Sequence, residues 1–102
     1  AAIGDDAMCD LLGKIDGDLQ RASSELAAGA AAGDMEKISG ATHVLISVCG
    51  AVGAKPLQTL AQKMNAAAHG RGDEAIETLA ADIELHTRKL REFVRARAGA
   101  AG

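Results

Sequence analysis

Apolar side chains recur along this chain in steps of three and four residues, the spacing that places them on one face of an α-helix. The pattern runs through residues 5–31, 35–52, 56–69 and 74–97. The positions that carry it are, in chain order, Met8, Leu11, Leu12, Ile15, Leu19, Ala22, Leu26; Met35, Ile38, Leu45, Cys49, Val52; Leu57, Leu60, Ala61, Met64, Ala67; and Ile76, Leu79, Ile83, Leu90, Phe93, Val94. The spacing predicts four amphipathic helices.

Three breaks separate these segments. Gly33-Asp34 and Gly72-Asp73 each place a glycine where a helix can end in the left-handed conformation, followed by an aspartate that can cap the next helix. The third is Gly53-Ala54-Lys55-Pro56, whose proline suits the first turn of a new helix. Because short connections favour antiparallel neighbours, we expect an all-α, up-down antiparallel four-helix bundle. Gly13 and Gly17 weaken the first helix by up to about 1 kcal/mol each, which allows a bend or a frayed start.

Composition narrows the class of protein. The 102 residues, 1–102, suffice for one domain with a modest core, and 48% are hydrophobic although Phe93 is the only aromatic residue. A net charge of −3 without a basic stripe disfavours nucleic acid as a partner. No apolar run is long enough for a membrane span, and no cleavable signal segment is visible. Two cysteines without CxxC spacing indicate buried thiols in a reducing cytoplasm, so we expect a cytoplasmic protein.

The segment 35–52 has a second face opposite its apolar stripe. Gly40, His43, Ser47 and Gly50 are spaced so that they share one strip, and His43 points about 140° away from Ile38 on the stripe. Two glycines inside a helix together cost roughly 2 kcal/mol relative to alanine. Close approach of a neighbouring helix would explain them, and so would close approach of a partner protein. His43 itself could be a packed core histidine, a metal ligand or a nucleophile that another protein must reach.

The spacing around His43 resembles the histidine-containing phosphotransfer (HPt) domain. Asp34 stands nine residues before His43, and Leu45, Gly53-Ala54, Leu57 and Leu60 follow it. The stretch in that family reads His-x-Leu-Lys-Gly, then Gly-Ala six residues after that glycine, then Leu-x-x-Leu. The likeness extends over residues 20–97, most of the chain.

The resemblance implies a function. His43 would accept a phosphoryl group from the aspartyl-phosphate of a response-regulator receiver domain and pass it to a second receiver, with a hybrid sensor histidine kinase as a further partner. The partner-docking surface would consist of Gly40, Val44, Ile46, Ser47 and Gly50. The domain would have no cofactor of its own, because the receiver supplies Mg²⁺. An imidazole, with a reference pKa of about 6.5, offers a neutral nucleophilic nitrogen at cellular pH.

Two positions depart from the family pattern. Its lysine is Ile46 here, and the glycine after it is Ser47. Losing that cation predicts a less stable phosphohistidine or slower transfer. The Ser47 hydroxyl could donate to a phosphoryl oxygen, or it could be a solvated or back-bonding helix serine. Two alternatives therefore stay open: a degenerate HPt-like bundle that docks receiver or kinase domains without phosphotransfer, and a structural helical dimer whose small-residue strip is the interface.

Other candidates for chemistry are weaker. His69 precedes Gly70 at a predicted helix end, where histidine interacts well with the helix dipole. His86 and Asp82 supply too few ligands for zinc, so we expect no metal site. The run Arg88, Lys89, Arg91, Arg95 and Arg97 is expected to be a solvated face, with steering of an acidic partner surface as the alternative. The Arg-Gly-Asp tripeptide within residues 70–73 is interpreted as turn chemistry.

Overall fold

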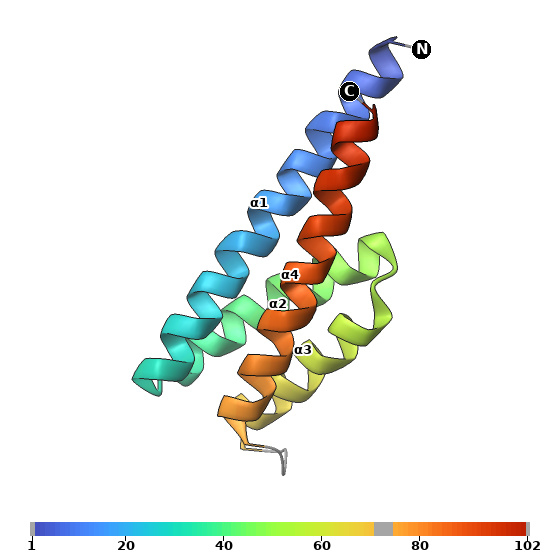
Figure 1. Ribbon diagram of the computed structural model, residues 1–102. Helices are drawn as coiled ribbons and strands as arrows, with labels where there is room; N and C mark the ends of the chain where they lie inside the picture. Colours follow the sequence, from blue (N-terminus) through green and yellow to red (C-terminus); the bar gives the residue numbers. More distant parts are fainter. Residues whose placement is uncertain (1, 71–74, 102) are drawn as a thin grey trace.

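The chain is all-helical over the residues that the structure, a computed structural model, describes. These are residues 2–70 and 75–101, with side chains over 7–70 and 75–97. The helices are α1 (Ala2–Ala32), α2 (Met35–Val52), α3 (Lys55–Ala68) and α4 (Ile76–Ala101) (Figure 1). The predicted helical class is confirmed, and the bounds of α2 are the predicted ones. The Gly72-Asp73 break and the Arg-Gly-Asp tripeptide lie outside the described residues.

The helices pack as a ring, in which each contacts the next along the chain and α1 also contacts α4. At 1.5 Å per residue, α1 is about 46 Å long and α2 only about 27 Å, in a molecule of 49 × 22 × 18 Å. The start of α1 and the end of α4 lie together at one end of the molecule (Figure 1). Within the described residues the arrangement is that of a small helical bundle. α1 is one unbroken helix through Gly13 and Gly17.

Helix ends follow the predicted capping chemistry at the first two connections. Gly33 and Gly53 have φ of 68° and 74°, and the next backbone N–H after each donates to a carbonyl five residues back, Asp34 to Gly29 at 2.8 Å and Ala54 to Cys49 at 2.9 Å. Asp34 then caps α2, because its Oδ1 accepts from the Lys37 backbone N–H at 3.1 Å. These caps confirm that α2 begins after Asp34 and ends before Gly53. The helix bounds in turn determine which side chains of α2 share a face with His43.

The core is aliphatic and is shared by all four helices. Its fully buried large side chains are Leu19, Ile38, Leu45, Met64, Leu79 and Ile83. Three of the five apolar positions predicted for α2 are buried, Ile38, Leu45 and Cys49, together with Ala41 and Thr42 on the same face. The stripe prediction was wrong for Met35 and Val52, which are exposed because they lie in the first and last turns of α2.

Three further apolar positions of the predicted stripes are exposed. Met8 and Leu11 lie in the first turns of α1, and Phe93 lies near the end of α4. Since α1 and α4 are much longer than α2 and α3, part of their apolar faces has no helix to cover it. The periodicity was correct for these residues, whereas their burial depended on the length of the neighbouring helices.

The basic end of α4 is not the uniformly solvated face that was predicted. Arg91 Nε donates to Asp16 Oδ1 at 2.8 Å, and Arg95 Nε donates to Asp16 Oδ2 at 3.3 Å, so two arginines of α4 hold one carboxylate of α1. The hydrogen bond from Arg91 is the main reason why the pKa of Asp16 lies below its usual value.

Among the described residues, none of the helices combines the length and the apolar character that a membrane span requires.

Candidate functional site

His43 lies in the middle of α2 with its side chain exposed to solvent. Its immediate neighbour Thr42 is fully buried, so the helix turns its core face away from the ring. Gly40, Ser47 and Gly50 are exposed as well, which confirms that they share the outward strip with His43. No hydrogen bond or ion pair holds the imidazole within the described part of the chain. A packed core histidine is therefore excluded.

The two glycines of this strip do not serve helix packing. A Cβ added to Gly40 would meet no heavy atom within 4 Å. A Cβ at Gly50 would lie 3.3 Å from Nε2 of Gln58, the far end of a flexible side chain. By contrast, a Cβ at Gly29 of α1 would lie 3.0 Å from Ile38 Cγ1 and 3.2 Å from backbone atoms of α2. Close helix approach explains Gly29, but it does not explain Gly40 or Gly50.

An apolar groove of about 430 Å³ runs along α1 and α2 beside this strip. The side chains that line it are Leu11, Leu12, Lys14, Ile15, Asp18, Ser47, Val48, Ala51 and Val52. Ser47 lies one turn after His43, so the groove begins at the edge of the histidine's own strip. Val44, on the same side of α2, lines a second recess with Asp18, Arg21 and Glu25. A protein that covered His43 would also contact this groove.

The other flank of the strip carries a polar network that the sequence pattern did not reveal. Ser39 Oγ donates to Asn65 Oδ1 on α3 at 3.3 Å. Thr42 Oγ1 donates to the Ser39 carbonyl at 2.9 Å and lies 3.4 Å from the same Asn65 oxygen. Gln58 Nε2, nearer the start of α3, donates to the Ile46 carbonyl at 3.5 Å. These contacts tie α2 to α3 on either side of His43. Asn65 was missed because its partners lie on another helix.

The strip that His43 shares with Gly40, Ser47 and Gly50 carries no acidic residue, lysine or arginine, whereas Asp18, Arg21 and Glu25 line the recess beside Val44. Ile46, at the position where the HPt pattern has lysine, is half-buried and packs against the core. Lys37 and Lys55 are exposed, and no contact brings either ammonium group to the ring. Ser47 is exposed, and no hydrogen bond occupies its hydroxyl within the described residues. The groups on the outward strip itself are thus a neutral hydroxyl and two glycines.

The other two histidines have local partners. His69 follows the last residue of α3, and its Nδ1 donates to the Asn65 carbonyl at 2.8 Å, as expected of a helix-ending residue. Nδ1 of His86 donates to the backbone carbonyl of Asp82 at 2.8 Å, so the ring does not engage the Asp82 carboxylate. Within the described residues no group of three or more histidine, cysteine, aspartate or glutamate side chains is placed to hold a metal.

The two cysteines differ in burial. Cys49 is fully buried in the core, and burial raises the pKa of its thiol to about 11. Cys9 is only half-buried, so the prediction of buried thiols holds fully for Cys49 alone. Cys49 points into the core whereas His43 points outward, which excludes a cysteine–histidine catalytic pair.

Comparisons of the chain with protein-family models, curated proteins and solved structures find no match. Function is therefore inferred from the residues around His43 and from their geometry.

Proposed function

We propose that this chain is a histidine phosphotransfer protein in which His43 is the phosphoacceptor. The observation that carries the proposal is the exposed imidazole at the centre of a strip whose glycines have no packing role. The two glycines together cost α2 roughly 2 kcal/mol of stability relative to alanine and bring no internal contacts in return. A second protein that needs the space best explains their presence. The proposal includes an up-down antiparallel course for the four helices and a cytoplasmic location.

The chemistry requires little from this chain. An unprotonated imidazole nitrogen attacks the phosphorus of an aspartyl-phosphate, the bond from phosphorus to the carboxylate oxygen breaks, and the carboxylate leaves. Positioning and charge stabilisation dominate such transfers, and the receiver domain with its Mg²⁺ supplies both the donor and the metal. The bundle supplies an accessible nucleophile and a docking surface formed by Gly40, Val44, Ile46, Ser47 and Gly50. Transfer in the reverse sense, to a second receiver, uses the same geometry.

The direct test uses a receiver domain labelled on its aspartyl-phosphate in the presence of Mg²⁺. Label should move to the wild-type chain and not to His43→Gln, whose helicity should be unchanged because the residue is exposed. Replacing Gly50 by leucine should weaken receiver binding while the fold persists, since Gly50 is exposed and the atom nearest to an added Cβ is the flexible end of the Gln58 side chain. Retention of full binding by the Gly50 variant would remove the support for a cleared docking surface.

A degenerate bundle that docks receivers or kinases without phosphotransfer is the second candidate. The observation that favours it is Ile46, half-buried against the core where the family pattern has a cation. In that case receiver-dependent NMR shifts should appear along α2 while no label reaches His43. If the chain is phosphorylated, Ile46→Lys should lengthen the lifetime of phosphohistidine. An unchanged or shorter lifetime would contradict the role given to charge.

A further inference from the structure

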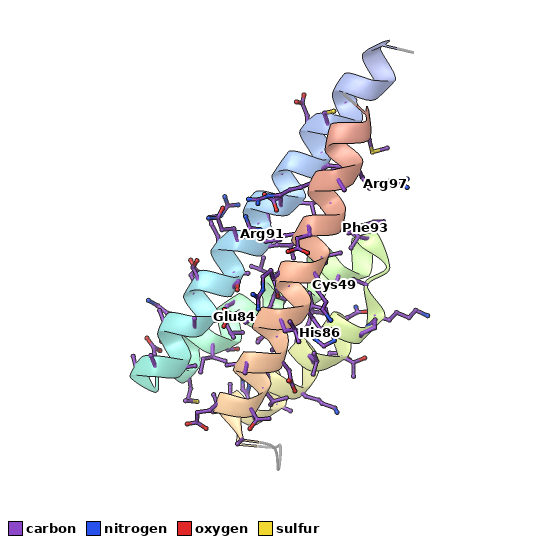
Figure 2. All side chains as sticks on the ribbon, viewed as in Figure 1. Cys49, Glu84, His86, Arg91, Phe93 and Arg97 are labelled. Carbon is purple, nitrogen blue, oxygen red and sulfur yellow. The ribbon has the colours of Figure 1, made fainter. Side chains whose placement is uncertain are left out.

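A second exposed feature lies on α4, which is not in contact with α2 among the described residues. Phe93, the only aromatic residue of the chain, is 60% exposed, the largest fraction among the exposed large hydrophobic side chains. Lys89 and Arg97 stand four residues before and after it, so the three side chains share one face of the helix. We call Lys89, Phe93 and Arg97 the α4 strip. Figure 2 shows Phe93 and Arg97 on the side of α4 away from α1.

The cations of the α4 strip differ from the neighbouring arginines of α4 in their ion pairing. Arg91 and Arg95, on the side of α4 that faces α1, are held by Asp16. Lys89 and Arg97 form no ion pair within the described residues, and the Arg97 guanidinium lies 5.8 Å from the centre of the Phe93 ring. The chain as a whole carries a charge of −3, so two unneutralised cations around an exposed ring are a local reversal of charge. Leu90, three residues before Phe93, is half-buried and packs against the core.

We propose that the α4 strip docks an acidic helical segment of a partner protein, with an aliphatic side chain of that segment against Phe93. Charge complementarity selects the occupant, because carboxylates at helical spacing can approach Lys89 and Arg97 together while the ring buries apolar surface. A nucleic acid is the weaker occupant, since a single aromatic on a chain of net charge −3 offers neither a stacking platform nor a continuous basic track. The strip lies on a different helix from His43, so the proposal does not depend on the proposed phosphotransfer.

The probe is a synthetic helical peptide of about 18 residues, five turns, with leucine at every third or fourth position, a glutamate beside each leucine and alanine elsewhere, so that the carboxylates do not unfold the helix by repulsion. Binding to the full chain is measured by fluorescence anisotropy, with a single-stranded oligothymidine and an anionic vesicle as parallel probes. We expect a Kd below about 100 μM for the peptide. Screening should weaken binding several-fold between about 50 and 300 mM NaCl.

Variants with matched controls locate the contact. Phe93→Ser and Lys89→Glu/Arg97→Glu should each weaken peptide binding at least about tenfold. Met35→Ser removes an exposed apolar residue of α2, 37% exposed, which lies on another helix than the α4 strip, and should change nothing. Arg88→Glu reverses a cation of α4 that lies off the strip, and its effect should be much smaller than that of the strip variants. All five positions have solvent-exposed side chains, so circular dichroism should show an unchanged fold.

The proposal is overturned if the acidic peptide fails to bind, if Phe93→Ser and Met35→Ser have equal effects, or if oligothymidine or vesicles bind more tightly than the peptide. Labelling of His43 by a phosphorylated receiver should be the same in Phe93→Ser and in the wild type. That measurement separates failure of the α4 strip from failure of the phosphotransfer proposal.

Discussion

Glycine-to-alanine substitutions at Gly40 and Gly29 should change stability in opposite directions. Both glycines lie inside helices, where alanine is favoured by about 1 kcal/mol because it restricts the unfolded chain and shields the backbone. At Gly40 the new methyl group meets no atom within 4 Å, so this gain should be retained in full. The expected stabilisation is about 0.5–1 kcal/mol, which corresponds to a rise in Tm of several degrees for a domain of this size.

At Gly29 the same gain is opposed by a close contact. The added Cβ would lie 3.0 Å from Ile38 Cγ1, and 3.2 Å from both the Asp34 carbonyl oxygen and the Ile38 backbone nitrogen. Backbone atoms in the capped connection between α1 and α2 cannot move without disturbing those caps. Overpacking of this kind costs about 1–3 kcal/mol, so Gly29→Ala should be neutral to destabilising by about 2 kcal/mol after the propensity gain.

The assay is urea unfolding followed by circular dichroism, with thermal unfolding as a second measure. Gly13→Ala is the matched control, because its added Cβ also meets nothing within 4 Å and should stabilise as Gly40→Ala does. The reasoning is refuted if Gly40→Ala destabilises the protein, or if Gly29→Ala stabilises it as much as Gly40→Ala. Either result would mean that the packing around α2 differs from that described above. The surface around His43 would then not be a cleared docking surface.

Three further predictions concern the interior and the ion pair. Asp16→Asn should lower the free energy of unfolding by about 1 kcal/mol at pH 7, measured by urea unfolding, because it loses the charged contacts with Arg91 and Arg95. Because the pKa of Asp16 is lowered in the folded state, chiefly by Arg91, this difference should be constant above about pH 5 and disappear as the pH falls below about 4. Thr87→Val should stabilise by about 1 kcal/mol on thermal unfolding, since the buried Thr87 hydroxyl has no hydrogen-bond partner among the residues that the structure describes. Cys49, with its thiol pKa near 11 and no exposed surface, should resist iodoacetamide at pH 8 until the chain unfolds, as followed by mass spectrometry.

The outcomes that would contradict these expectations are equally specific. A difference between wild type and Asp16→Asn that did not shrink as the pH was lowered from about 5 to about 2.5 would show that charge is not the source of the effect. Loss of stability in Thr87→Val would indicate a hydrogen bond that the hydroxyl makes through water. Rapid alkylation of Cys49 in the folded protein, with the urea-unfolded chain as the reference, would show that the core opens locally.

Local sequence signals determined much of the helical architecture. The periodicity of three and four gave the four helices, and Gly33, Asp34 and Gly53 gave the bounds of α2, because helix capping involves only neighbouring residues. The same periodicity placed His43 opposite the core, and its ring is exposed. These features depend on φ, ψ and side-chain direction within one segment, which a single sequence specifies.

Features that depend on two helices at once were not accessible in this way. The exposure of Leu11 and Phe93 followed from the lengths of α1 and α4 relative to α2 and α3. The pairing of Asp16 with Arg91 joins residues 75 positions apart, and the contacts of Asn65 with Ser39 and Thr42 cross from α3 to α2. The vacant space beside Gly40 also emerged only from packing. Burial and side-chain partners are set by which helix faces which, and at what height along the bundle, and that relation belongs to the tertiary structure.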